Sequence, residues 1–273
     1  MVKFSVIIPT YNRVDLTQRA VDSVLSCPGS EYSEVIVIDD CSSDSYQSLN
    51  LRKHDKYFRL KSNQGAAFCR NYGMDLAVGE VIYLLDSDDY FIFRDFQEDY
   101  NFILNSDASA FYCDMKSGAS CSKFPNNVDH SNFLDFTLNR HEGIANTCTL
   151  VFLSARKFRF TSGLPRHQDW DFLYRNIFKK GGQLKKLGGF VFIDRSDKKS
   201  ISRAGTPEKS YIWLDYMQNE LSADQYCNLR YHVLSHFCSE YSWPSFFKLG
   251  FRLVLQRRLS VFKFIKRFVQ RFL

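Results

Sequence analysis

The segment YLLDSDDY, residues 83–90, places three carboxylates within four positions, directly after an apolar run. Asp86, Asp88 and Asp89 would repel one another if all three were ionised in one pocket. A hard divalent cation such as Mg²⁺ or Mn²⁺ relieves this repulsion and takes phosphate oxygens as further ligands. The segment therefore indicates a site for a metal ion that carries a nucleoside diphosphate. A group of helix-capping acids on a solvated loop is the alternative.

Two more polar clusters follow apolar runs in the same way. Residues 9–12 (PTYN) come after Phe4–Ile8, and Asp39-Asp40 comes after Glu34–Ile38. The turn after the first run has no glycine, which excludes the dinucleotide fingerprint G-x-G-x-x-G, and a phosphate-binding P-loop motif is absent as well. The side chains left for chemistry at these turns are a tyrosine, several acids and an arginine.

Strand-like and helix-like segments alternate in the first part of the chain. Strands are expected at residues 4–8, 34–38, 57–61 and 81–85, and helices at residues 15–26 and 65–77. The strands are unbroken apolar runs, which is typical of a parallel sheet covered by helices on both faces. Ligands of such sheets bind beyond the carboxyl ends of the strands, so the three polar clusters should meet at one edge. Further elements are expected at residues 93–104, 111–115, 148–153, 167–178 and 188–193.

Composition limits the number of domains and the class of protein. The 273 residues are 45% hydrophobic and 24% charged, which fits one large domain with an appendage and argues against global disorder. We assign residues 1–195 to the domain and residues 196–273 to a helical C-terminal region. The eight cysteines are scattered without a C-x-x-C pair, which indicates reduced thiols and no structural zinc. Neither a signal peptide nor an apolar run of transmembrane length is recognised.

The basic charge of the chain is concentrated at its end. Residues 241–273 contain eight basic residues and no acid, and the rest of the chain has 28 basic and 30 acidic residues. This distribution argues against nucleic-acid binding. Apolar residues recur in the tail at helical spacing, and a basic helix of this kind suits an anionic membrane surface. A helix docked on this protein's own surface or on a second subunit is the alternative.

The ordered set of motifs resembles a known enzyme family. SVIIPTYNR, EVIVIDDCSSD, SNQGAAFCRNYGMDLAVGEVIYLLDSDD and RHQDWDFLYR follow one another between residue 3 and about residue 195. Together they resemble the inverting glycosyltransferases of family 2, which have the GT-A fold. The resemblance implies transfer of a sugar from a nucleotide donor to an acceptor hydroxyl, and the expected fold is a GT-A α/β fold with a mostly parallel nucleotide-binding sheet.

The resemblance also implies which residues contact the donor. These residues are Pro9, Thr10, Tyr11, Asp40, Arg70, Asp86 and Ser87. Tyr11 would stack on the base, Asp40 would accept a hydrogen bond from it, and Asp86 would contact the ribose. Alternatives are a loop tyrosine packed on a helix for Tyr11 and an ion pair between Arg70 and Asp40 that holds the loop. Asp39 is expected to cap the next turn.

Asp88 is implied as the direct ligand of Mn²⁺ or Mg²⁺, and Asp89 as a residue that orients the loop or holds a metal-bound water. In the motif HQDWD, Asp169 corresponds to the general base that removes the acceptor proton. Two departures from the family pattern are Gln168, where many relatives have Glu, and Cys41, where relatives often have Gly. We read Asp171 as structural and leave Trp170 open between the acceptor and the core.

The resemblance implies a UDP-hexose donor and a saccharide acceptor, and the tail favours an acceptor that is lipid-linked. The HQDWD variant resembles bacterial enzymes of surface polysaccharide or lipopolysaccharide synthesis, so we expect a cytoplasmic enzyme peripheral to the inner face of the cell membrane. A nucleotidyltransferase and a non-catalytic sugar-nucleotide-binding scaffold are the rival hypotheses. The sugar, the linkage and the oligomeric state are not specified by the sequence.

Overall fold

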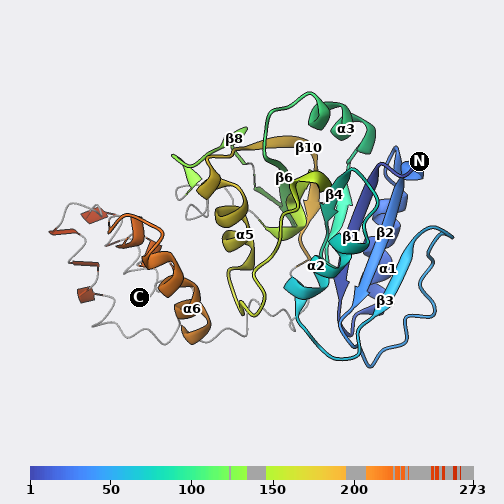
Figure 1. The fold of residues 1–273 in the computed structure, drawn as a ribbon, viewed down its shortest axis with the longest axis horizontal. Coiled ribbons are helices and arrows are strands. Elements are labelled where there is room, and N and C mark those ends of the chain that lie inside the picture. The colour runs from blue at the N-terminus through green and yellow to red at the C-terminus, as the bar shows by residue number, and fades with distance from the viewer. Residues whose placement is uncertain are drawn as a thin grey trace. The chain divides into compact units, whose positions relative to one another are not determined.

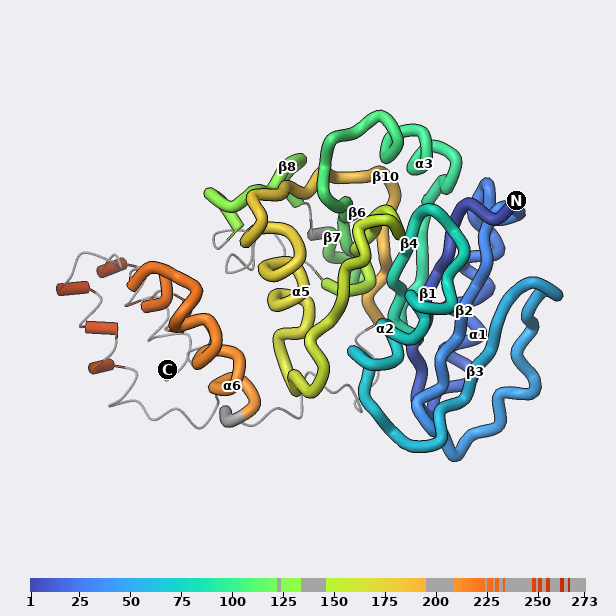
Figure 2. Tube along the Cα trace, in the orientation of Figure 1, coloured from blue at the N-terminus to red at the C-terminus, as the bar shows by residue number. Residues whose placement is uncertain are grey.

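The structure, a computed structural model, describes residues 1–122, 124–133, 146–194 and 207–223, with scattered residues between 225 and 265. The chain forms two compact units. The first contains Met1–Gly163 and Gln168–Asp197, and the second contains Leu164–His167 and Lys198–Leu273. Figure 1 shows the elements as a ribbon, and Figure 2 follows the chain as a tube.

Four parallel strands form the first part of the sheet. They are β1 (Phe4–Thr10), β2 (Ser33–Asp39), β3 (Lys56–Arg59) and β4 (Val81–Leu84), in the order β3-β2-β1-β4. β1 and β2 are buried along their whole lengths, as their unbroken apolar runs predict. Because the four strands are parallel, their carboxyl ends lie at one edge of the sheet (Figure 1).

Two helices cover the opposite faces of these strands (Figures 1 and 2). α1 (Val14–Leu25) packs on the face that includes Val35, and α2 (Ala66–Leu76) packs on the face that includes Ile36. Successive residues of a strand point to opposite faces, so adjacent residues of β2 contribute to two separate apolar clusters. The predicted parallel sheet with helices on both faces is therefore confirmed for this half.

The sheet continues with strands of mixed direction. These are β9 (Leu150–Leu153), β6 (Ala110–Ser117), β10 (Leu184–Phe192) and β5 (Tyr90–Ile92), in the order β4-β9-β6-β10-β5. β9 is antiparallel to both β4 and β6, whereas β10 is parallel to β6. Short strands β7 (Ser120–Ser122) and β8 (Asn127–Val128) pair with β6 and β10. The expected α/β fold is confirmed, with one parallel half and a mixed remainder.

The region after residues 86–89, the aspartate loop, differs from the expected single helix. β5 was not predicted, and α3 (Phe96–Leu104) begins three residues later than Phe93, the expected start. Asp95 sets that start, because its carboxylate accepts hydrogen bonds from the amides of Gln97 and Glu98. The next long helix, α5 (Gln168–Asn176), lies within the predicted range. Single 3₁₀ turns are η1 (Ser30–Tyr32), η2 (Thr147–Thr149), η3 (Ser154–Arg156) and η4 (Phe178–Lys180).

The longest described element of the second unit is a helix. α6 (Pro207–Gln218) buries Trp213, Leu214 and Met217. His167 belongs to this unit, since its Nε2 lies 2.9 Å from the hydroxyl of Ser210. No helix among the described residues is long and apolar enough to cross a membrane.

The predicted amphipathic tail is only partly described. Its described apolar side chains are largely exposed: Phe247, Phe251, Leu255, Val261, Phe262 and Ile265. Apart from Lys248, its basic residues lie outside the described residues. Binding of the tail to an anionic membrane therefore stays a prediction.

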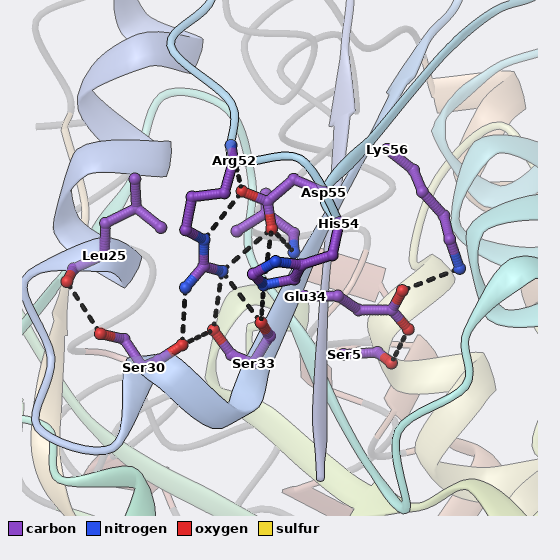
Figure 3. Close-up of polar contacts among 10 residues, drawn as sticks. Ser5, Leu25, Ser30, Ser33, Glu34, Arg52, His54, Asp55 and Lys56 are labelled. Atoms are coloured by element: carbon purple, nitrogen blue, oxygen red, sulfur yellow. Dashed lines mark hydrogen bonds and ion pairs between the residues drawn. The ribbon is translucent and has the colours of Figure 1, made fainter. Parts of the chain in front are cut away.

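A polar network holds the amino ends of the central strands together, opposite the edge with the three polar clusters (Figure 3). The guanidinium of Arg52 donates to the carbonyls of Ser30 and Ser33, at 2.7 and 2.9 Å, and to the carboxylate of Asp55. The Asp55 side chain is fully buried. Burial alone would raise the pKa of Asp55, but hydrogen bonds from Arg52 and from the Val35 amide lower it below its usual value.

This network predicts an acid-sensitive contribution to stability. Asp55→Asn should reduce the free energy of unfolding by about 2 kcal/mol at neutral pH, because it removes charged hydrogen bonds. A lowered folded-state pKa stabilises above the unfolded-state value, so the difference from the original protein should shrink below about pH 4. Urea unfolding at several pH values measures it. Asp107→Asn is the control, since Asp107 is an exposed partner of Lys185. Equal losses of unfolding free energy in Asp55→Asn and Asp107→Asn would show that burial of Asp55 does not strengthen its ion pair.

Candidate active site

The three polar clusters meet at the carboxyl edge of the parallel strands, as predicted. The amide of Asp40 donates to the carbonyl of Thr10 at 2.9 Å, which joins the ends of β2 and β1. The amide of Leu85 donates to Ile7 of β1, which places the aspartate loop, residues 86–89, at the same edge. The site therefore arises from the strand order β2-β1-β4.

Two arginines balance the carboxylates of the aspartate loop. Arg70 of α2 lies 2.6 Å from Asp86, and Arg13, just before α1, lies 2.7 Å from Asp88. The possible ion pair between Arg70 and Asp40 is therefore replaced by a pair with Asp86. The fold itself therefore supplies two positive charges to this cluster of carboxylates.

The third aspartate lies deeper than the other two. Asp89 is 3% exposed, and Asp86 and Cys148 lie beside it, with one ligand atom of each within 4.8 Å of the others. Burial raises the pKa of Asp89 well above its ordinary range, and the nearby carboxylates of Asp86 and Asp88 add to the effect. A divalent cation would offset this repulsion. The carboxylate oxygens of Asp86 and Asp89 suit a hard cation such as Mg²⁺ or Mn²⁺, whereas the buried Cys148 thiol is not a ligand that these ions prefer.

The loop after β1 presents one side chain for stacking. Thr10 is buried, and its hydroxyl lies 2.7 and 2.8 Å from the hydroxyls of Thr17 and Tyr46. Pro9 is buried as well, whereas Tyr11 is 47% exposed. Any donor contact of Thr10 would thus involve its main chain, and Tyr11 is the residue here whose ring is available to a base.

The acids after β2 hold the loops around them. The two carboxylate oxygens of Asp40 accept hydrogen bonds from the amides of Gln64 and Gly65, at 2.6 and 2.8 Å, and so fix the entry to α2. Each oxygen retains a second lone pair, so this role is compatible with the predicted contact to a base. Asp39 accepts a hydrogen bond from the amide of Ser42, which confirms its predicted role as a cap of that turn.

Cys41 occupies a position that favours glycine. Its φ is +66°, in the left-handed region that costs L-residues roughly 1–2 kcal/mol. The departure from the family's glycine therefore strains the turn without preventing it. We expect Cys41→Gly to raise the free energy of unfolding by up to about 1 kcal/mol, since the greater freedom of glycine in the unfolded chain offsets part of the relief.

Cys41→Ser serves as the matched control, because it retains the strained backbone and the size of the side chain. Chemical unfolding of both variants measures the effect. A Gly variant less stable than the Ser variant would show that the left-handed turn is not under strain.

Asp169 lies in the first turn of α5. Gln168, one residue earlier, accepts a hydrogen bond from Arg70 at 3.3 Å, and Arg70 also pairs with Asp86. Loss of hydration raises the pKa of Asp169 to about 6, although backbone hydrogen bonds and the charge of Arg70 partly counteract it. At neutral pH the Asp169 carboxylate is therefore mostly ionised and more basic than an ordinary aspartate, which suits a general base.

Gln168 retains the contact that a glutamate would make, without its charge. Arg70 is 6% exposed, its Cζ lies 5.2 Å from the centre of the Phe160 ring, and its Nε has no hydrogen-bond partner among the described residues. One buried cation thus connects the aspartate loop with the start of α5.

Other residues of the HQDWD motif have structural roles. Asp171 is 1% exposed and accepts hydrogen bonds from Thr161 and Arg175, which confirms the structural reading. Trp170 is 2% exposed, and this resolves the open alternative in favour of the core.

Sequence reasoning missed several side chains around the aspartate loop. Arg13 stands within the quoted motif PTYNR, so its position beside the site was visible, but its pairing with Asp88 was not. Cys148, Arg19 and Asp194 gave no signal, because they lie far along the chain from residues 86–89.

Comparison with known proteins identifies the family. The sequence model of Glycosyl transferase family 2 matches residues 5–163, more than half of the chain. The chain belongs to glycosyl transferase family 2. The match includes the aspartate loop and the donor-side residues but ends before Asp169.

Curated relatives include proteins of bacterial polysaccharide synthesis. The chain is 27% identical over 256 residues to the amylovoran biosynthesis glycosyltransferase AmsB of Erwinia amylovora, covering 81% of this chain and 79% of AmsB. It is 44% identical over 96 residues to a GalNAc(5)-diNAcBac-PP-undecaprenol beta-1,3-glucosyltransferase of Campylobacter jejuni, 33% of this chain and 30% of that protein. It spans only 16–18% of the first relatives matched, uncharacterized glycosyltransferases of Rickettsia species.

The solved structure of Staphylococcus aureus TarS residues 1–349 in complex with UDP-GlcNAc resembles this fold. The TM-score is 0.68 at 22% identity, and the superposition covers 99% of this chain and 81% of that one. At this identity the likeness shows the fold alone, which is the GT-A fold expected from the motifs.

Proposed function

We propose that the protein is an inverting glycosyltransferase that moves a hexose from a UDP-sugar to a hydroxyl of a saccharide acceptor. The observation that carries this proposal is the contact of Arg70 with both Asp86 of the aspartate loop and Gln168 beside Asp169. A buried arginine thereby brings the donor edge and a basic carboxylate to one place. Family membership supports the reaction class.

Asp169 acts as the general base in this proposal. An inverting transfer needs one carboxylate to take the proton from the acceptor oxygen as that oxygen attacks the anomeric carbon. The leaving diphosphate departs from the opposite face, so no covalent intermediate and no second nucleophile are required. A pKa of about 6 leaves most of Asp169 ionised at neutral pH, with greater basicity than an unperturbed aspartate.

A divalent cation, Mn²⁺ or Mg²⁺, completes the donor site. Asp88 would hold it directly, with Asp86 and Asp89 beside it. When bound, the cation supplies positive charge that offsets the charge growing on the leaving diphosphate. Asp88 pairs with Arg13 at 2.7 Å, so this guanidinium is a second source of positive charge at the same carboxylate.

We infer that the nucleotide is UDP. The exposed ring of Tyr11 offers a stacking surface, worth about 1–3 kcal/mol for any base. Asp40 would accept the N3–H of uracil through lone pairs that its loop amides do not use. The UDP-GlcNAc complex of the structural neighbour TarS supports a UDP-sugar without fixing the sugar.

Calorimetric titration with UDP, CDP and GDP in the presence of Mn²⁺ tests the donor site. UDP should bind most tightly, and Tyr11→Ala should weaken all three nucleotides by a similar factor, because stacking does not discriminate between bases. Equal binding of the three nucleotides would contradict the role of Asp40.

The acceptor is proposed to be lipid-linked, and the enzyme to work at the inner face of the cell membrane. The exposed apolar side chains of the tail and the eight basic residues of positions 241–273 support attachment to an anionic surface. The name of the Campylobacter jejuni relative, which acts on an undecaprenol-linked acceptor, supports the same class. Sedimentation with anionic and with neutral vesicles tests the attachment, and equal binding to both would contradict it.

A further inference from the structure

Arg19 of α1 reaches the aspartate loop from the side. Its Nη2 donates to the main-chain carbonyl of Asp88 at 2.7 Å, and its Nη1 lies 2.8 Å from the carboxylate of Asp194. The guanidinium also covers the ring of Tyr90, with 4.9 Å between its Cζ and the ring centre. One planar cation therefore contacts the loop, the first residue of β5 and Asp194, two residues after the end of β10.

Asp194, the partner of Arg19, also contacts the aspartate loop. Its amide donates to the carboxylate of Asp89 at 3.1 Å, and its own carboxylate receives Arg19. Tyr90 and Phe192 stack at 4.8 Å and face each other in the β5–β10 pair. The aspartate loop, α1 and the end of β10 are thus joined in a closed circuit of hydrogen bonds and packed rings.

Arg13, at the N-cap of α1, and Arg19, within α1, hold Asp88 in different ways. Arg13 pairs with the carboxylate, the group that a divalent cation would use, so this contact competes with the cation. Arg19 holds the carbonyl instead, and this contact is compatible with a cation on the carboxylate. The Arg19 contact can therefore persist throughout a reaction cycle.

We propose that Arg19 and Asp194 are positioning residues that set the geometry of the aspartate loop for the cation and the diphosphate. This inference rests on the proposed function. In this proposal neither Arg19 nor Asp194 touches the donor. Both act through the main chain of Asp88 and the carboxylate of Asp89, as outer groups do when they orient metal ligands.

Three substitutions test the circuit. Arg19→Gln and Asp194→Asn each remove one side of the ion pair. Arg19→Lys retains the charge but lacks the planar fork that reaches two acceptors, so it should behave like the Gln variant. In the presence of UDP, the affinity for Mn²⁺, followed by the electron paramagnetic resonance of the ion, should fall about 10- to 100-fold. Thermal unfolding should show that each variant remains folded.

Hydrogen exchange gives a readout that depends on neither metal nor activity. The peptide that covers residues 85–92 should exchange faster in Arg19→Gln and Asp194→Asn, whereas peptides of β1 and β2 should not change. The double variant should lose no more Mn²⁺ affinity than either single variant, because the two residues belong to one circuit. Lys185→Gln is the control, since it removes an ion pair with the exposed Asp107.

Unchanged loop exchange in Arg19→Gln, or additive losses in the double variant, would overturn the proposal. Faster loop exchange with unchanged Mn²⁺ affinity would overturn it as well, because the circuit would then hold the loop without serving the cation. If the original protein bound neither Mn²⁺ nor UDP, the proposed function would fail and the positioning role with it. Hydrogen exchange of residues 85–92 would still show whether Arg19 and Asp194 hold the loop, and so would separate a failure of the proposed function from the absence of this contact.

Discussion

Asp169→Asn should reduce sugar transfer by orders of magnitude and leave the binding of the nucleotide near that of the original protein. The asparagine has the same shape but cannot accept the acceptor proton, and a positioned general base contributes about 10²- to 10⁴-fold to the rate. Transfer is measured as product formation from the UDP-sugar and the acceptor, and binding by calorimetric titration with UDP. The expected result is a fall in kcat of that size with a change in Kd of less than about threefold.

Asp75→Asn is the matched control, because Asp75 is an exposed carboxylate paired with Arg159. It should change neither transfer nor binding. Transfer at the original rate in Asp169→Asn would refute the assignment of the base, and equal losses of transfer and of UDP binding would indicate a structural role.

The same assignment fixes the acid side of the pH profile. The carboxylate acts only when deprotonated, and burial raises the pKa of Asp169 to about 6. Activity should therefore fall about tenfold per pH unit below pH 6 and level off above it. The residual activity of Asp169→Asn should not show this fall below pH 6.

Asp88→Asn should have the second largest effect. It removes the negative charge that would hold the cation and leaves Arg13 without its carboxylate partner at 2.7 Å. Metal ions contribute several kcal/mol of charge stabilisation to a developing leaving group, so kcat should fall about 100-fold or more. The affinity for Mn²⁺ in the presence of UDP, measured by paramagnetic resonance, should fall in parallel.

Higher Mn²⁺ concentrations should rescue part of the activity of Asp88→Asn, since Asp86 and Asp89 remain beside the site. The Asp169→Asn variant supplies the comparison, because added metal should not restore it. A full rate at the original metal concentration in Asp88→Asn would exclude Asp88 as a ligand.

The sequence sufficed for the parts of the fold that depend on local pattern. The buried runs of β1, β2 and β4 predicted a parallel sheet, and the polar clusters that follow them were predicted to share one edge of it. The structural reading of Asp171 followed from its spacing to Asp169 on a helix. These predictions are confirmed because burial on both faces leaves a continuous apolar signal in the chain.

Contacts between distant segments could not be predicted. Arg19 and Asp194 are 175 positions apart, and no periodic pattern connects them. The inward direction of the Thr10 hydroxyl depends on Tyr46, which lies in a loop without a strand or helix signal. β5 is only three residues long, and its partner β10 has an irregular register between Lys186 and Phe190, so neither strand is defined by sequence alternation alone.

The central claim is metal-dependent use of a UDP-sugar, and slow donor hydrolysis tests it most directly. The purified full chain is incubated with a panel of UDP-sugars and GDP-sugars in Mn²⁺, and release of the nucleotide is followed with and without a chelator. We predict release of UDP from one hexose donor, lost on chelation and restored by added Mn²⁺. Release that continues in the chelator, or release from GDP-sugars alone, would contradict the account.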